Sequence, residues 1–374
     1  MRQSNTWTVR GLAATGAAVV VGLAMIGGCE SKTTPTAGKP PASEAKAPAL
    51  KTPSIAFDLP DKYNTPDGMT VDKAGNIILS VNNYNDPNFP AVMLRISPDD
   101  KLSEIITLPK NGDTGKSVCP LGVAVGSDGN LYIADNQAFT TDEHKSRLMR
   151  ITMKDGKGVK CEPVVTGLVM ANGVAARGDR IYVCDSKLDG KASPLPSGVY
   201  GFKIADLDPA KPIAVKPGTD DPHLAIKFFT KNKEWAVGAN GLGFGSAGDM
   251  FVCNFGDAEL IQAKIGPDGK AVSQKVVAAG SGMLCCDGLS IDRKTGEVYI
   301  ADFLGNAVHK VDPKTGKVTT IAKNDNTDGA GGALDRPSEP CVRGNRVYVA
   351  NIDLPLAGNK YDKPHTVSVI ELGK

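Results

Sequence analysis

The sequence predicts an all-β protein, a six-bladed β-propeller that is closed by pairing between its N-terminal and C-terminal strands. The first observation is a pattern that occurs six times: a small turn, an acidic or amide residue, a glycine, an apolar run, a hairpin, and a β-rich run that ends in Asp or Asn. The key residues of successive copies are 47 to 68 residues apart. A period of roughly 40–50 residues with several strands per unit is typical of propeller blades.

A tight hairpin joins two apolar runs in every copy. In the second copy, residues 122–125 and 131–135 are β-rich, and Ser127-Asp128-Gly129-Asn130 separates them. Such dipeptides of Gly with Asp or Asn supply the positive φ that two-residue hairpins require. The other five copies place a glycine at the equivalent position: Gly75, Gly178, Gly248, Gly296 and Gly344. We therefore expect an inner and a second strand in each of the six blades.

Two strand-like segments at the ends of the domain lack a partner within their own repeat. Residues 54–59 precede the first blade, and residues 366–370 end the last blade with no strand after them. Pairing these segments closes the ring and removes an exposed sheet edge. The long third interval holds an insertion, residues 186–235, with strand-like runs at 198–204 and 224–230. Its Pro- and Asp-rich middle, residues 206–222, is either a lid over one face or a solvated loop.

The first fifty residues are typical of an export signal followed by a linker. A basic start, an apolar run from Gly11 to Ile26 and the small residues before Cys29 predict a signal peptide over residues 1–28. A Cys directly after Gly-Gly resembles the bacterial lipobox, which implies a lipid on Cys29. Residues 29–51 are rich in Pro, Ala and Lys and predict an extended tether. The propeller then spans residues 52–374, outside the cytoplasm, and Glu30 favours the outer membrane if the host is Gram-negative.

Composition narrows the partners further. The formal net charge is +2 with 22% charged residues, and no basic stripe with interleaved aromatic residues is present, so nucleic acid is not expected. We expect a monomer. Cys184 and Cys253 occupy a repeat position that favours a small core residue. Four other cysteines lie within two residues of a key position, and an exported chain can oxidise them; these are Cys119, Cys285, Cys286 and Cys341.

The acidic or amide residue of each copy defines what we call the axial positions, because equivalent positions of a propeller converge on its axis. These positions are Asp67, Leu121, Asn172, Asn240, Asp287 and Glu339. Five of them offer oxygen ligands, which is the preference of calcium. Asp-Gly and Asn-Gly are also ordinary turn dipeptides, and Leu121 shows that the position need not be polar. The constant phase of the copies nevertheless favours one axial divalent cation.

The residues from Asn172-Gly173 to Asp185 and from Asp287-Gly288 to Asp302 resemble the senescence-marker-protein/gluconolactonase family, which is related to paraoxonase-like and strictosidine-synthase-like propellers. The resemblance spans residues 52–374 and implies six blades around one calcium or other divalent ion. It implies Asp67, Asn172, Asn240 and Asp287 as ligands, with Asp67 in place of a family Glu. Glu339 is a candidate to compensate for that shorter side chain.

This resemblance implies hydrolysis of a lactone or an ester, with Asp287 as the acid or base. Leu121 stands where paraoxonases have a histidine, which argues against their histidine mechanism. His309 lies on an expected outer strand and is interpreted as a surface residue. His223 borders the insertion and is a candidate to overhang the pocket. The low aromatic content does not support stacking against a sugar.

Two other functions remain open from the sequence. The repeat equally fits NHL-repeat propellers, which implies a non-catalytic module that binds a protein or a glycan at the cell envelope. A lyase or synthase on the same scaffold is the third possibility. A widely reused fold does not decide among them. The axial positions favour the hydrolase, because a binding module does not need Asn and Asp in successive blades.

Overall fold

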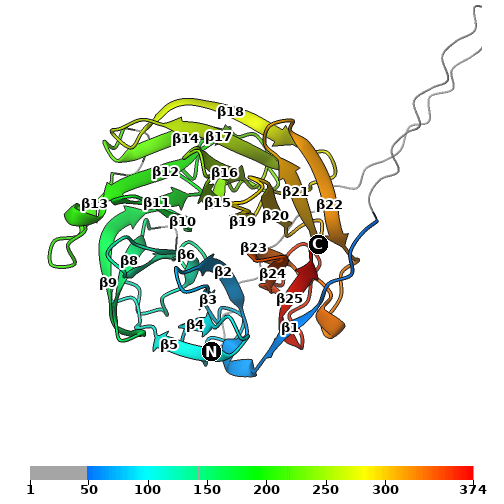
Figure 1. The fold of residues 1–374 in the computed structure, drawn as a ribbon. Coiled ribbons are helices and arrows are strands. Elements are labelled where there is room, and N and C mark those ends of the chain that lie inside the picture. The colour runs from blue at the N-terminus through cyan, green and yellow to red at the C-terminus, as the bar shows by residue number, and fades with distance from the viewer. Residues whose placement is uncertain (1–48, 142, 217, 219, 374) are drawn as a thin grey trace, which may run out of the picture. The chain divides into compact units, whose positions relative to one another are not determined.

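The computed structural model describes residues 49–373, except residues 142, 217 and 219, and these belong to one compact unit, Ala47–Lys374. The predicted signal peptide, the lipid on Cys29 and most of the tether lie outside the described residues and stay predictions. The unit consists of six sheets around one axis, so the predicted six-bladed β-propeller is confirmed (Figure 1). Among the described residues, no helix has the length and apolar character needed to cross a membrane.

Each blade is an antiparallel sheet whose first strand lies nearest the axis (Figure 1). Blade 1 contains β2 (Pro66–Val71), β3 (Ile77–Val81), β4 (Val92–Ile96) and β5 (Leu102–Thr107). Blade 2 contains β6 (Pro120–Val125), β7 (Leu131–Asp135), β8 (Ser146–Lys154) and β9 (Lys157–Leu168). Blade 3 contains β10 (Ala171–Arg177), β11 (Arg180–Asp185), β12 (Leu195–Lys203) and β14 (Leu224–Thr230).

The second half of the ring repeats this arrangement. Blade 4 contains β15 (Ala239–Phe244), β16 (Met250–Asn254), β17 (Glu259–Ile265) and β18 (Ala271–Ala279). Blade 5 contains β19 (Leu289–Ile291), β20 (Val298–Asp302), β21 (Ala307–Asp312) and β22 (Lys317–Lys323). Blade 6 contains β23 (Pro337–Arg343), β24 (Arg346–Asn351), β25 (His365–Glu371) and β1 (Ser54–Leu59). Short 3-10 helices occur at Asp61–Tyr63, Ile204–Asp206 and Ala330–Gly332.

Blade 6 closes the ring with strands from both ends of the described chain. β1 pairs antiparallel with β25, from Ser54 opposite Val369 to Leu59 opposite His365. The predicted strand closure is therefore confirmed. The packed domain begins slightly before β1, because the backbone N–H of Lys51 donates to the carbonyl of Ile321, 2.7 Å away.

The middle of the insertion in blade 3 lies at the outer rim rather than over one face, and most of its described residues are exposed. Its two predicted strands are β12 and β14, the outer strands of the blade. Between them, β13 (Ile213–Ala214) crosses to the outer edge of blade 2 and pairs in parallel with β9 (Figure 1). Residues 213–215 therefore join two blades at the rim, and the edge of β9 gains a hydrogen-bonding partner.

Apolar side chains fill the interfaces between neighbouring blades rather than one central core. The cluster between blades 2 and 3, for example, contains Tyr132 and Leu148 of one blade with Ile181 and Tyr200 of the next. Similar clusters lie between the other pairs of adjacent blades, including the first and the last. The second strands of the blades, such as β7 and β20, therefore bury both faces, as their continuous apolar runs require. The space at the axis remains for function.

Candidate functional site

The axial side chains lie at the start of the innermost strands, where the strand pairing is interrupted. In blade 1, Pro66 pairs with Val81 and Met69 pairs with Leu79, so Asp67 and Gly68 lie in a β-bulge. The same shift in register occurs in blades 2, 3 and 4. A bulge turns a side chain away from the regular alternation of a strand and is common beside active sites. It turns the axial residue toward the centre of the ring.

The structure changes the alignment of the sixth copy by one residue. Pro337 pairs with Asn351 as Ala171 pairs with Asp185, so the sixth axial position belongs to Ser338. Glu339 stands where the other copies have a glycine. The predicted alignment was wrong because Ser338-Glu339-Pro340 contains no glycine to mark the phase. Glu339 still lies close to the axis, and its Oε2 would be 2.1 Å from a Cβ added to Gly288.

The glycine after the axial residue allows adjacent blades to approach closely. A Cβ at Gly173 would lie 2.2 Å from the carbonyl oxygen of Asn240, in the next blade. A Cβ at Gly241 would likewise lie 2.6 Å from the carbonyl oxygen of Asp287. These carbonyls belong to axial residues, so the absence of a side chain on one blade positions the axial residue of the next.

One pocket of about 110 Å³ collects the candidate residues. Its polar lining consists of Asp67, Asn172, Asn240, Asp287 and Ser338. The predicted axial set is thus brought together except for Glu339, which lines a second cavity on the other side of these residues. Asp67 and Asn240 are buried, and Asp287 is partly open to the pocket.

Aromatic and aliphatic side chains form the rest of the pocket wall. Four are aromatic: Phe139, Trp235, Phe255 and Phe303. The aliphatic part includes Ile352, Leu354 and Leu356. The low overall aromatic content did not indicate this wall, because it does not limit how many rings gather in one place. A signal was present: Phe255, Phe303 and Ile352 each follow directly the Asp or Asn that ends the second strand.

Burial and mutual repulsion raise the pKa values of the carboxyl groups near the axis. Burial raises the pKa of Asp67 to about 7, although a hydrogen bond with Ser338 acts in the opposite direction. Burial and then the charge of Asp67 raise the pKa of Asp287 well above its usual value, despite a hydrogen bond from Asn240. Burial, Asp67 and Asp287 have the same effect on Glu339. None of the ion pairs among the described residues involves these three acids.

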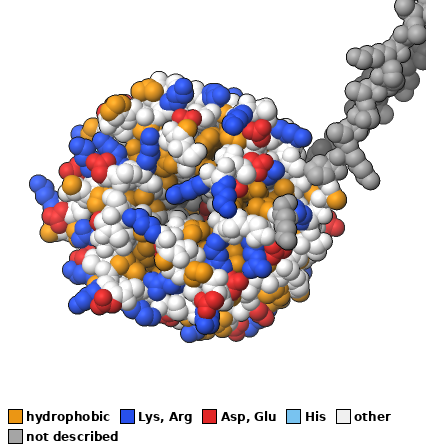
Figure 2. Space-filling model, in the orientation of Figure 1, with side chains coloured by type: hydrophobic (Ala, Val, Ile, Leu, Met, Phe, Trp, Pro, Cys, Tyr) orange, Lys and Arg blue, Asp and Glu red, His pale blue; other side chains and the backbone are white. Residues whose placement is uncertain are grey.

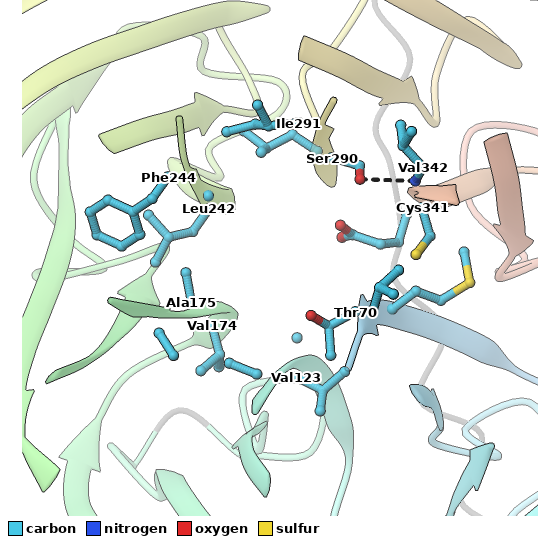
Figure 3. A pocket seen from close by; sticks show the side chains of 18 of the residues that line it. Thr70, Val123, Val174, Ala175, Leu242, Phe244, Ser290, Ile291, Cys341 and Val342 are labelled. Atoms are coloured by element: carbon cyan, nitrogen blue, oxygen red, sulfur yellow. Dashed lines mark hydrogen bonds between the residues drawn. The ribbon is translucent and has the colours of Figure 1, made fainter. Parts of the chain in front are cut away.

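The second cavity, of about 420 Å³, occupies the opposite end of the axis. Figure 3 shows its lining, to which every blade contributes from its innermost strand, and the labelled side chains are mostly aliphatic, among them Val123, Val174 and Leu242. The backbone N–H of Val342 donates to Ser290 Oγ across 3.0 Å between blades 6 and 5 (Figure 3). This cavity is larger, but except for Glu339 the axial oxygen donors line the smaller pocket.

Basic side chains lie beside the hollow at the centre of the molecule. Figure 2 shows Lys and Arg side chains beside a central depression on the face that it draws. Arg293 and Lys294 belong to the lining of the 420 Å³ cavity. These charges lie on the far side of the axial residues from the aromatic wall.

The remaining candidates do not line the smaller pocket. His223 pairs with Asp221 at 2.9 Å and stacks on Phe202 in the outer part of blade 3, so it does not overhang the pocket. The cysteines of the described chain are free thiols. The two that meet are Cys253 and Cys286, whose sulfurs are 2.7 Å apart between blades 4 and 5.

Solved structures with the same architecture are enzymes of several kinds. A luciferin-regenerating enzyme superimposes with a TM-score of 0.57 at 14% identity, over 86% of this chain and 96% of its own. A gluconolactonase from Xanthomonas campestris gives 0.52 and 14%, over 88% and 99%. A PQQ-bound aldose sugar dehydrogenase from Streptomyces coelicolor gives 0.53 and 14%, over 87% and 98%. The fold is that of the gluconolactonase-like propellers.

The likeness of this propeller to other proteins is one of architecture. No model of a known protein family matches its sequence, and no curated protein matches it. Each of the three structures above is 14% identical to it. Since one fold supports many activities, its chemistry has to be argued from its own pocket.

Proposed function

We propose that this propeller hydrolyses a lactone or an ester in the 110 Å³ pocket, with a divalent cation, calcium by preference, held at the axis. The observation that supports this most is the set of oxygen donors in one pocket: two carboxylates, two amides and a hydroxyl. Asp67, Asn172, Asn240 and Asp287 are the proposed ligands, and Ser338 adds a fifth oxygen. The alternative is a non-catalytic, NHL-like module that binds a glycan or a protein.

The oxygen donors of this pocket fit a hard cation, and no basic side chain of the described chain takes that place. Asp67 and Asp287 repel each other in a buried place, and no Lys or Arg pairs with either. Ion pairing or cation binding is the usual way in which buried carboxylates remain charged. Calcium accepts carboxylate, amide and hydroxyl oxygens in a flexible geometry. Glu339 stays a candidate ligand that would approach from the end of the axis where the larger cavity lies. Its carboxylate lies against Gly288.

The chain's own residues then have distinct roles. A bound divalent cation supplies Lewis-acid polarisation of the substrate carbonyl. Asp287, the more open of the two carboxylates, accepts the proton of the attacking water. Water adds to the carbonyl carbon, the bond to the ring or ester oxygen breaks, and that oxygen leaves as a hydroxyl after it takes from Asp287 the proton that the water gave up. The aromatic wall excludes bulk water and holds the apolar side of the substrate.

We also propose that the protein works outside the cytoplasm, attached to the membrane by a lipid on Cys29. The lipobox-like sequence before Cys29 and the Pro-rich segment after it support this. Labelling with a fatty acid should mark the full chain, and Cys29→Ser should remove the label. A labelled Cys29→Ser variant would contradict the proposal.

Titration calorimetry on the full chain, freed of metal with a chelator, tests the axial site. We expect Asp67→Asn and Asp287→Asn to lose one bound calcium per chain. Asp58→Asn, at an exposed position on β1, is the control and should bind as the unchanged protein does. The same proteins should be assayed on a sugar δ-lactone, an aliphatic γ-lactone and phenyl acetate.

Hydrolysis that depends on calcium and falls about 100-fold or more in Asp287→Asn would support the catalytic proposal, in which Asp287 is both a ligand and the base. Calcium binding without hydrolysis of any ester or lactone would contradict the catalytic proposal and favour the binding module. Unchanged calcium binding in both axial variants would contradict the proposed ligands.

A further inference from the structure

Blade 6 brings together three aspartates that belong to neither cavity. Asp335 lies just before β23, Asp353 lies just after β24, and Asp362 lies before β25. Because neighbouring strands are antiparallel, these three places meet at one end of the sheet. One oxygen of each carboxylate lies within 4.8 Å of those of the other two. Sequence analysis did not find this group, since its members are separated by loops of different length.

Two of the three carboxylates are buried without a neutralising partner. Asp335 is 2% exposed and Asp353 is 3% exposed. Oδ1 of Asp335 is buried and takes no hydrogen bond from any described residue, and the same is true of Oδ1 of Asp362. No Lys, Arg or His forms an ion pair with this group within the described chain. A buried charge of this kind is costly unless a cation or a proton neutralises it.

One basic side chain beside this group, that of Arg336, makes its hydrogen bonds elsewhere. The guanidinium of Arg336 donates to the carbonyls of Phe303 and Leu304, at 3.1 and 3.3 Å, and to that of Ala357 at 2.8 Å. Arg336 therefore supports the loop backbone rather than the aspartates. Hydrogen bonds from other residues of its own loop orient the carboxylate of Asp353.

A fourth oxygen donor is present beside Asp353. Asn359 is 7% exposed, and its Nδ2 donates to Asp353 Oδ1 at 2.8 Å. Its Oδ1 is buried and has no hydrogen-bond partner among the described residues. The backbone N–H of Asp362 donates to Asp353 Oδ2 at 3.1 Å. Carboxylate and amide oxygens held by two adjoining loops are the ligands that calcium uses in proteins.

We infer that Asp335, Asp353 and Asp362, with Asn359, form a second divalent-cation site, separate from the axis, that takes calcium. The site joins the segment before β23 to the loop between β24 and β25. That loop comprises residues 352–364, and its successive residues belong in turn to the pocket and to the cation site. Ile352, Leu354 and Leu356 line the 110 Å³ pocket, whereas Asp353 belongs to the cation site.

The site therefore positions one wall of the pocket. An ion that holds Asp353 holds the two pocket residues on either side of it. The existence of the site does not depend on the proposed hydrolase activity, but its effect on substrate binding rests on that function. The number of bound ions tests the existence of the site separately from its effect on substrate binding.

The test is the number of calcium ions bound by the full chain, measured by titration calorimetry after treatment with a chelator. We expect two ions for the unchanged protein and one for Asp362→Asn, whose side chain is the most exposed of the three. Asp67→Asn should also bind one ion, and the double variant should bind none. Asp325→Asn, an exposed acid in the loop before β23, is the matched control and should bind two.

Asp335→Asn gives a second, independent readout. Removing this unpartnered carboxylate should raise the Tm measured in chelator and abolish the part of the calcium-induced Tm increase that Asp67→Asn retains. Equal calcium binding by Asp362→Asn and the unchanged protein would overturn the inference, because the aspartates would then share protons instead. If only the axial proposal fails, the unchanged protein and Asp67→Asn both bind one ion, and Asp362→Asn binds none.

Discussion

At the scale of single residues, a buried contact between a histidine and an aspartate links the second and third strands of blade 5. His309 lies on the third strand of blade 5, and its Nε2 is 3.1 Å from Asp302 Oδ2. The expectation that His309 is at the surface was wrong, since its side chain is 1% exposed. Burial favours a higher pKa for Asp302, but hydrogen bonds from His309 and from the N–H groups of Leu284 and Gly305 outweigh it and lower that pKa.

His309→Ala should therefore destabilise the protein by about 3 kcal/mol or more, because it leaves a buried carboxylate without its partner. His223→Ala is the matched control: its His–Asp pair is 2.9 Å long, but the histidine is 35% exposed. We expect a loss below about 1 kcal/mol there. Chemical denaturation of both variants measures the difference. Equal losses would show that burial of the pair is not what matters.

At the scale of strands, the bulge and the glycine behind it act as one unit. The bulge turns the axial side chain inward, and the missing Cβ lets the next blade's axial carbonyl approach. The pocket is thus assembled by backbone contacts between adjacent inner strands. Its geometry should be sensitive to changes that do not touch any proposed ligand.

Gly173→Ala tests this dependence. The new Cβ would lie 2.2 Å from the carbonyl oxygen of Asn240, so blades 3 and 4 must separate. We expect a destabilisation of about 1–3 kcal/mol and weaker calcium binding at the axis. In Gly190→Ala the new Cβ meets nothing within 4 Å, and this control should remain stable. The measurements are the free energy of unfolding and calorimetry; unchanged binding in Gly173→Ala would contradict the close-approach argument.

At the scale of the whole molecule, buried acids at two places link stability to pH and to calcium. Burial raises the pKa of Asp67 to about 7. Burial and the charges of Asp353 and Asp362 raise the pKa of Asp335 to about 8. The folded protein therefore holds protons that the unfolded chain, with ordinary aspartates, has already released. Unfolding releases protons, so stability without a cation falls as pH rises.

The Tm in chelator should accordingly decrease from about pH 4.5 to about pH 8, because the two carboxyl groups titrate near pH 4 in the unfolded chain and at about 7 and 8 in the folded protein. Excess calcium should remove or reverse this decrease, because it stabilises the ionised carboxylates. Asp67→Asn and Asp335→Asn should each make the decrease shallower, and Asp58→Asn should leave it unchanged. Differential scanning calorimetry at several pH values measures the slope. A Tm in chelator that rises with pH would contradict the assignment.

The fold was predictable from the sequence because its determinants are local and repeated. Each hairpin needs a glycine with positive φ, and the structure has φ between 58° and 86° at all six. The phase of the axial residue relative to that hairpin is equally local, which is why Asp67, Asn172, Asn240 and Asp287 were found together. The closing pair β1 and β25 followed from counting strands without partners.

Other features depend on contacts between residues far apart in the chain, and only the tertiary structure decided them. Ser338 rather than Glu339 occupies the sixth axial position, because pairing with β24 sets the register of the strand. The aromatic wall, the burial of His309 and the group of Asp335, Asp353 and Asp362 arise where loops of different blades and strands meet. By itself, then, the sequence determined the six blades and four of the proposed axial ligands. The shape of the pocket required the folded ring, and the second cation site required the pairing of β23, β24 and β25, because both bring together side chains that no repeat period relates.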